Sequence, residues 1–173
     1  MPQAILSVYD KTGLVDLARR LTDLGWHLLA SGGTAKALRA AGIDVEEIAG
    51  YTGAPEILGG RVKTLHPAIH GGILARASGK DLEEIEGLGY KAVDMVVVNL
   101  YPFEKTAANP ASSRDEIIEQ IDIGGVALIR AAAKNHERVT ILCDIADYAP
   151  AIAEIEAAGT VPESMRRALA AKA

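Results

Sequence analysis

Short apolar runs that alternate with helix-like patterns constrain the fold of this chain more than any other feature. The strongest run is Val93-Asp-Met-Val-Val-Val98, which is almost continuously apolar and therefore typical of a strand buried on both faces of a sheet. Strands are also predicted at residues 4–8, 27–30, 44–48 and 139–142. Helices are predicted at 12–24, from a turn at 31–34 as far as 41, and at 81–88, 113–121 and 126–135. Because strand–helix–strand units join parallel strands, the sequence predicts an α/β fold, with an open, mainly parallel sheet and helices on both faces.

The last part of the sequence predicts where the domain ends. A helix over 148–158 is expected to end at Gly159, and Thr160, Pro162 and Glu163 are typical of the start of another helix. A chain of 173 residues has the length of one domain. We therefore expect one domain over residues 1–158, followed at 159–173 by an arm or connecting helix that leads toward a missing domain.

The composition excludes several classes of protein. A net charge of -5 argues against nucleic-acid binding, which requires a basic surface. No basic segment precedes an apolar run at the beginning of the chain, and no apolar stretch has the length of a membrane span. We therefore expect a cytoplasmic protein with no membrane contact. The one cysteine, Cys143, follows an apolar run and is expected to be an ordinary buried residue.

Polar residues follow the first two predicted strands, at the edge where parallel sheets bind ligands. Tyr9, Asp10 and Lys11 follow the first strand. The second is followed by Ser31-Gly-Gly-Thr34, whose glycines and helix start suit a phosphate group. An ordinary strand-to-helix turn explains the same four residues, so both interpretations stay open.

Two further candidates lie near the exit of the central strand. Asn99 and Tyr101 come directly after it, and Asp122 precedes a later helix. Each also has a purely structural explanation. The Tyr101 ring could pack under the turn that follows it, and Asp122 could serve only as a helix cap.

The stretch Gly59-Gly-Arg-Val-Lys-Thr-Leu-His-Pro-Ala-Ile-His-Gly-Gly72 concentrates charge among residues that break helices and strands. We interpret it as a binding loop. Arg61 and Lys63 suit an anionic ligand, whereas His66 and His70 suit proton carriers or supports of the loop. A zinc site is a poor alternative, because a proline lies between the histidines and no third ligand is near.

Lys134 ends a predicted helix after three alanines. Its simplest role is to neutralise the negative end of the helix dipole. Alternatively, alanine surroundings would suit the ammonium group to a proton shuttle with Asp122 and Tyr101. The sequence does not place these groups within reach of one another.

Five blocks together resemble a known family: SVYDKTG, SGGTAKAL, GGRVKTLHPAIHGGIL, VVVNLYPF and EQIDIGGVALIRAAAKNH. In this order they are similar to the inosine monophosphate (IMP) cyclohydrolase domain of the bifunctional purine biosynthesis protein, from about Ser7 to Tyr148. The resemblance implies a methylglyoxal-synthase-like α/β fold. It also implies that a folate-dependent formyltransferase domain follows, toward which 159–173 would lead.

The resemblance implies a reaction of the hydrolase class that acts on a cyclic amidine. 5-Formamidoimidazole-4-carboxamide ribonucleotide closes its ring to give IMP and water, as the last step of purine biosynthesis. It implies no metal and no cofactor for this domain, since folate serves only the formyltransferase domain. The implied partners are the purine ribonucleotide substrate, the IMP product and a second copy of the chain in a homodimer.

The resemblance also implies roles for single residues. Lys63 would stabilise the formyl oxygen, and Lys134, Asp122 and Tyr101 would form a proton relay. The substrate phosphate would lie on Ser31, Gly32, Gly33 and Thr34, with Lys11 nearby. The remaining nucleotide contacts would come from Tyr9, Asp10, Arg61, Val62, Thr64, Val98, Asn99, Ile123 and Gly124. Tyr9 is a departure, because some relatives have serine there.

Two other functions suit the same fold. A methylglyoxal-synthase-like lyase would also bind phosphate at a glycine-rich turn, but it needs a carboxylate base and leaves RVKTLHP and AAAKNH unexplained. A non-catalytic regulatory module would bind a nucleotide and need no relay.

Overall fold

A computed structural model describes all residues, 1–173, and contains a five-stranded open sheet in which every strand pair is parallel. The strand order is β3-β2-β1-β4-β5, and Ala4 of β1 pairs with Leu28 on one side and Met95 on the other. The predicted α/β class with a parallel sheet is therefore confirmed. The strands are β1 (Gln3–Val8), β2 (His27–Ala30), β3 (Glu46–Glu47), β4 (Met95–Asn99) and β5 (Thr140–Leu142).

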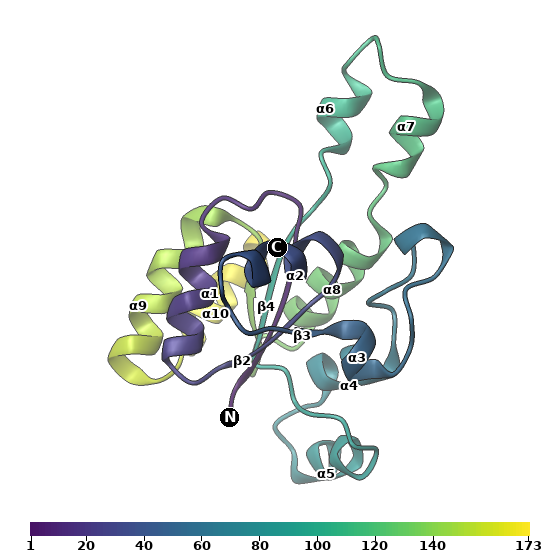
Figure 1. Cartoon of the computed structure of the whole chain (residues 1–173). Coiled ribbons are helices and arrows are strands. Elements are labelled where there is room, and N and C mark those ends of the chain that lie inside the picture. The colour runs from purple at the N-terminus through teal and green to yellow at the C-terminus, as the bar shows by residue number, and fades with distance from the viewer.

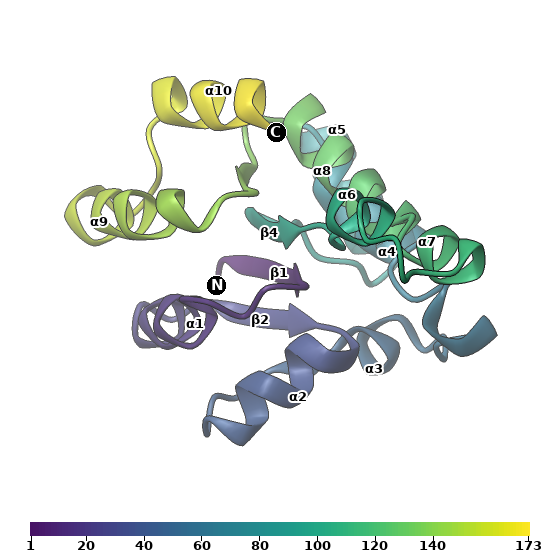
Figure 2. The same cartoon turned by 90° about the horizontal axis from the view of Figure 1, so that it is seen from above.

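Helices cover both faces of this sheet. Figure 2 shows α1 and α9 on one face and α4 and α8 on the other, as the sequence predicts. The helices are α1 (Leu14–Asp23), α2 (Gly32–Ala40), α3 (Ile48–Thr52), α4 (Pro67–Leu74), α5 (Gly79–Gly87), α6 (Phe103–Ala107), α7 (Arg114–Glu119), α8 (Ile123–Lys134), α9 (Tyr148–Ala158) and α10 (Glu163–Lys172). Two short 3-10 turns are η1 (Leu58–Gly60) and η2 (Ile145–Asp147).

The core is aliphatic and is centred on β1 and β4. Ile5, Leu6, Val96 and Val97 have no exposed surface, because the two middle strands are covered by helices on both faces. The leucine stripe of α1 packs on the same core. Burial of these side chains supplies most of the driving force for this arrangement.

Two segments rich in helix breakers are helical in the structure. Gly32 already belongs to α2, with Ser31 as the residue that precedes the helix, so the predicted turn at 31–34 is shorter than expected. Pro67 opens α4, and the Nδ1 atom of His66 accepts a hydrogen bond from the backbone N–H of Ala68 at 3.1 Å. A proline at the first helical position loses no hydrogen bond, which is why the second half of the charged stretch is helical.

Gly72 allows α4 to approach the segment that leads into β4. A Cβ atom on Gly72 would lie 2.5 Å from the carbonyl oxygen of Lys91 and 3.0 Å from the side chain of Val93. The carbonyl of Gly72 also accepts a hydrogen bond from the backbone N–H of Val93 at 3.0 Å. The glycine is therefore required by close backbone packing rather than by loop flexibility.

Replacing Gly72 with alanine is expected to destabilise the protein by about 1–3 kcal/mol, because the added methyl group overlaps backbone that cannot move freely. Gly71 is the matched control, since a Cβ atom there would meet only the Ile85 side chain, at 3.8 Å. Alanine at that position is expected to stabilise the helix by up to about 1 kcal/mol. Urea unfolding of both variants measures the difference, and equal midpoints would contradict this account of Gly72.

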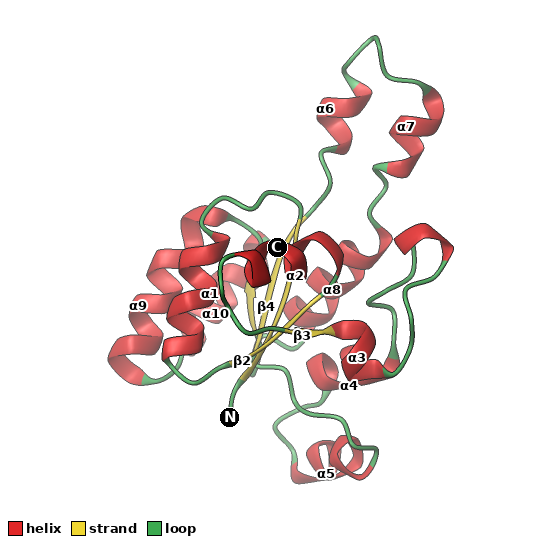
Figure 3. Ribbon diagram, in the orientation of Figure 1, coloured by secondary structure: helices red, strands yellow, loops and turns green.

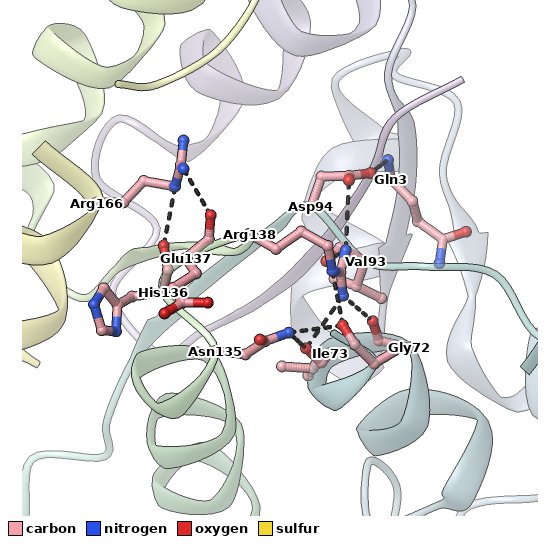
Figure 4. A network of polar contacts seen from close by, with 11 residues as sticks. Gln3, Gly72, Ile73, Val93, Asp94, Asn135, His136, Glu137, Arg138 and Arg166 are labelled. Carbon is pink, nitrogen blue, oxygen red and sulfur yellow. Dashed lines mark hydrogen bonds and ion pairs between the residues drawn. The ribbon is translucent and has the colours of Figure 1, made fainter. Parts of the chain in front are cut away.

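A polar network holds the end of α4 against the loop between α8 and β5 (Figure 4). The Arg138 guanidinium donates to the carbonyls of Ala75, Val93, Gly72 and Ile73, at distances from 2.6 to 3.2 Å. The Asn135 amide donates to the carbonyls of Ile73 and Ala75 at 2.7 and 2.8 Å. The carbonyls of Gly72, Ile73 and Ala75 lie at the end of α4, where carbonyls lack partners within the helix, so Arg138 and Asn135 together cap α4 from another element.

The last helix, α10, packs against the domain. Leu169 is buried, and Arg166 donates to the carbonyls of His136 and Glu137. Lys172 contacts the carboxylates of Asp144 and Asp147 at 2.8 Å each. The predicted helix is thus present and docked on the sheet, while its role as a connection to a further domain stays a prediction.

Helices α6 and α7 form an arm that projects from the body between β4 and α8 (Figure 1). Neither helix has a buried residue. The predicted capping box is present, because Ser113 and Glu116 exchange hydrogen bonds at the start of α7. A long loop that contains η1 extends from α3 to α4 (Figure 3).

Candidate functional site

The candidate site is a cavity beyond the carboxyl ends of β1 and β4. Chain connections leave these adjacent strands in opposite directions, which makes this the switch point where open α/β sheets bind ligands. The cavity has a volume of about 670 Å³, within the range of small-molecule sites. The predicted site residues that line it are Tyr9, Lys11, Gly33, Thr34, Arg61, Lys63, Thr64, Asn99, Tyr101, Asp122, Ile123 and Gly124.

The amino-terminal end of α2 forms one wall of the cavity. No hydrogen bond within the chain uses the backbone N–H groups of Gly32 and Gly33, and the Ser31 side chain does not cap the helix. The Thr34 hydroxyl instead joins α2 to β1, because it accepts from the N–H of Val8 at 3.2 Å and donates to its carbonyl at 3.1 Å. Two free N–H groups at the positive end of a helix dipole favour an anion here.

Two lysines add positive charge to the same wall. The Nζ atom of Lys63 lies 3.7 Å from where a Cβ atom on Gly32 would be. Burial lowers the pKa of Lys11, and the nearby charge of Lys63 lowers it further, while Asp10 acts in the opposite direction. Two ammonium groups brought together repel each other, and a bound anion would relieve that repulsion.

Asn99 is used to hold the loop after β1. Its Oδ1 atom accepts from the backbone N–H groups of Tyr9 and Asp10 at 2.7 and 2.8 Å, and its Nδ2 atom donates to the Asp10 carbonyl at 3.0 Å. The Tyr9 ring then meets the Tyr101 ring edge to face, with centroids 5.7 Å apart. Asn99 therefore has little remaining capacity for the nucleotide contact that the family resemblance implies.

Asp122 both caps α8 and lines the cavity. Its Oδ1 atom accepts from the backbone N–H of Gly125 at 2.7 Å. The two glycines of the helix start are required by space, because a Cβ atom on Gly124 would lie 2.9 Å from the Thr64 hydroxyl and one on Gly125 would lie 2.5 Å from the Asp122 carboxylate. The two glycines thus allow the start of α8 to approach both the buried Thr64 and the Asp122 carboxylate.

Several lining residues were missed by sequence reasoning. Glu119 at the end of α7 pairs with Arg61, which raises the pKa of Arg61 and lowers that of Glu119 through their hydrogen bonds. The others are Ser7, Val8, Gly59, Gly60, Ile118, Gln120, Ile121 and Gly125. Glu119 and Gln120 stand within the block EQIDIGG, so proximity to Asp122 was the available signal.

Five predicted contact residues lie outside the cavity lining. Val98 is fully buried, because helices cover both faces of the sheet at β4. Asp10 accepts hydrogen bonds from the backbone and hydroxyl of Thr12, and it lines a separate cavity with Cys143. The other three are Ser31, Gly32 and Val62, which adjoin lining residues in the sequence.

Lys134 is not brought together with the other predicted catalytic residues. It is exposed in the last turn of α8, whereas Asp122 precedes the first turn. A helix of 12 residues separates the two ends by about 18 Å. The three-residue relay of Lys134, Asp122 and Tyr101 therefore does not assemble within one chain.

The two histidines of the charged stretch do not line the cavity. His66 caps α4, and burial lowers the pKa of His70, whose Nε2 atom is buried without a partner. No group of three or more histidine, cysteine, aspartate or glutamate side chains is placed to hold a metal ion. None of the helices has the length and apolar character needed to cross a bilayer.

Comparisons with known proteins identify the family to which this fold belongs. Residues 13–127 match the MGS-like domain family, and residues 132–173 match the AICARFT/IMPCHase bienzyme family. The crystal structure of ForH superposes with a TM-score of 0.87 at 41% identity, covering 99% of this chain and 90% of that one.

Curated relatives are bifunctional purine biosynthesis proteins PurH. The protein from Cyanothece sp. is 58% identical over 89% of this chain and 30% of its own length. The protein from Sorangium cellulosum is 52% identical over 99% of this chain and 33% of its own length. This chain thus spans about a third of the length of these relatives. It belongs to the MGS-like domain family and corresponds to the amino-terminal IMP cyclohydrolase region of bifunctional PurH proteins.

Proposed function

We propose that this chain is an IMP cyclohydrolase, which closes the ring of 5-formamidoimidazole-4-carboxamide ribonucleotide to give IMP and water. The observation that carries the proposal is a single cavity in which Lys11, Lys63 and Arg61 meet Tyr101 and Asp122. These residues come from four of the five blocks that resemble the cyclohydrolase family. The names of the PurH relatives support a place for this chain in purine biosynthesis.

In the proposed reaction the carboxamide nitrogen attacks the formyl carbon, and a carbon–nitrogen bond forms. The formyl oxygen becomes an oxyanion and then leaves as water, with one proton from the carboxamide nitrogen and one from the formamide nitrogen. We assign stabilisation of this oxyanion to Lys63 and the proton transfers to Tyr101 and Asp122. Because both reacting groups belong to one substrate, holding them close together lowers the barrier further.

We assign the substrate phosphate to the free N–H groups of Gly32 and Gly33, with Lys11 nearby. Asn99 then acts by holding Tyr9 and the loop before Lys11. No metal or redox cofactor has a part in this scheme. A formyltransferase activity would belong to a segment outside this chain, and we place the reaction in the cytoplasm.

A lyase of the methylglyoxal synthase type is less well supported. It needs a free carboxylate base, but Asp122 is engaged by the N–H of Gly125 and Glu119 by Arg61. These are the two carboxylates that line the candidate site. A regulatory module is the remaining alternative, and it would bind the nucleotide without converting it.

We also propose a homodimer. Large apolar side chains are exposed near the cavity mouth, with Leu58 at 71% and Ile123 at 60% exposure. A role for Lys134 in the relay requires a second copy of the chain, because Lys134 lies too far from the cavity of its own chain. Sedimentation of the purified chain measures the assembly, and a monomer with full turnover would remove Lys134 from the relay.

The purified chain is expected to form IMP from the formamido ribonucleotide with no folate and with a metal chelator present. Formation of IMP, followed by absorbance and chromatography, tests the proposal directly. Dihydroxyacetone phosphate serves as the comparison substrate. Binding of IMP without turnover would favour the regulatory module, and release of methylglyoxal from the comparison substrate would favour the lyase.

A further inference from the structure

Arg61 lies on an exposed hairpin whose own packing does not hold it in place. Ile57 and Val62 exchange backbone hydrogen bonds at 3.1 and 3.4 Å, and Leu58, Gly59 and Gly60 between them have φ angles of 55°, 67° and 90°. This left-handed conformation is costly for a leucine, and the Leu58 side chain is 71% exposed. Burial of the hairpin therefore contributes little to the position of Arg61.

Glu119 supplies the contact that the hairpin lacks. The Nε atom of Arg61 donates to Oε2 of Glu119 at 3.3 Å, and its Nη2 atom donates to Oε1. No other hydrogen bond or ion pair joins residues 57–62 to another element. Glu119 ends α7, three residues before Asp122, so the pair connects the hairpin to the segment that carries the proposed relay.

The two-bond geometry leaves Arg61 able to bind a ligand at the same time. Of the five N–H groups of a guanidinium, this side-on pairing uses one on Nε and one on Nη2. Both N–H groups of Nη1 and the second on Nη2 stay free. Since Arg61 and Glu119 both line the cavity, an anionic substrate can bind Arg61 without displacing Glu119.

We infer that Glu119 is a positioning residue, which acts through Arg61 to orient the guanidinium toward the nucleotide. This inference rests on the proposed function. The direction of the change in Kd distinguishes this positioning role from simple charge repulsion. A negative charge at the cavity mouth repels an anionic ligand, so its removal alone would tighten binding. Loss of a positioning contact does the opposite.

The test compares Glu119→Gln, Arg61→Met and the double variant. We expect Glu119→Gln to raise KM and the Kd for IMP about three- to fivefold, with kcat within about twofold of the original value. In the Arg61→Met background the same change is expected not to raise KM or Kd, because only the repulsion between Glu119 and the anionic ligand is then removed. Glu47→Gln is the matched control, because Glu47 pairs with Arg39 at 3.1 Å at similar exposure and does not line the cavity.

An unchanged or lower Kd in Glu119→Gln would overturn the inference, as would an equal effect in the Arg61→Met background. Turnover by the unsubstituted protein is measured in the same assay and tests the proposed function separately. If that protein binds IMP without turnover, the reaction is refuted while IMP binding still measures the coupling of Glu119 and Arg61. If it neither binds nor turns over, both proposals fail.

Discussion

Replacing Lys63 with methionine is expected to lower kcat for ring closure by a factor of about 100 to 1000. Lys63 lines the cavity, and we assign its ammonium group to the oxyanion that forms at the formyl carbon. Loss of one donor to such an oxyanion has this magnitude in other enzymes, because the group acts most strongly in the transition state. Methionine keeps the aliphatic stem, so packing should change little. Steady-state kinetics of IMP formation measures the effect.

Lys36→Met is the matched control for charge. Lys36 is exposed on α2, the helix whose amino-terminal end faces the cavity, but it does not line the cavity. Its loss changes the net charge equally and should leave kcat unchanged. A decrease of less than threefold in Lys63→Met, with an unchanged thermal midpoint, would remove Lys63 from the role of oxyanion stabiliser.

Replacing Arg138 with methionine is expected to destabilise the fold by about 3 kcal/mol. The side chain is 13% exposed and its guanidinium donates to four backbone carbonyls. Charge-assisted hydrogen bonds of this kind are among the stronger ones, and their loss leaves buried carbonyls short of donors. For a domain of this size the Tm should fall by roughly 6–12 °C.

Arg76→Met is the control for this change. Arg76 also forms a two-bond pair, with Asp81, but its side chain is 76% exposed. Water replaces such contacts readily, so the Tm should change by less than about 2 °C. Thermal unfolding followed by circular dichroism compares the two variants, and equal shifts would contradict the capping role of Arg138.

The fold was predictable because its signals are local. The continuous apolar run around Val96 indicated a central strand, and the Ser113–Glu116 capping box indicated the start of a helix. Helices were harder to predict where a proline or a glycine stands at a helical position that tolerates it. Pro67 at the first position of α4 and Gly72 at a close backbone approach both resemble loop residues when their neighbours in space are unknown.

The candidate site was predictable in part, since the ends of parallel strands meet at one edge. Lys11, Tyr101 and Lys63 therefore meet in one cavity as expected. Lys134 lies outside that cavity, because it ends the helix that Asp122 precedes. The distance between the ends of a helix follows from the number of residues alone.

Sequence patterns alone predict the parallel α/β fold, the edge of the sheet at which the site lies and the residue types available there, because hydrophobic periodicity is a property of the chain. Which polar groups are already hydrogen-bonded depends on the tertiary structure. The amide of Asn99 is used by a loop 90 residues away, and Arg61 is held by a carboxylate 58 residues away. Hydrogen-bond partners at such separations depend on how the chain packs, and no local pattern encodes them.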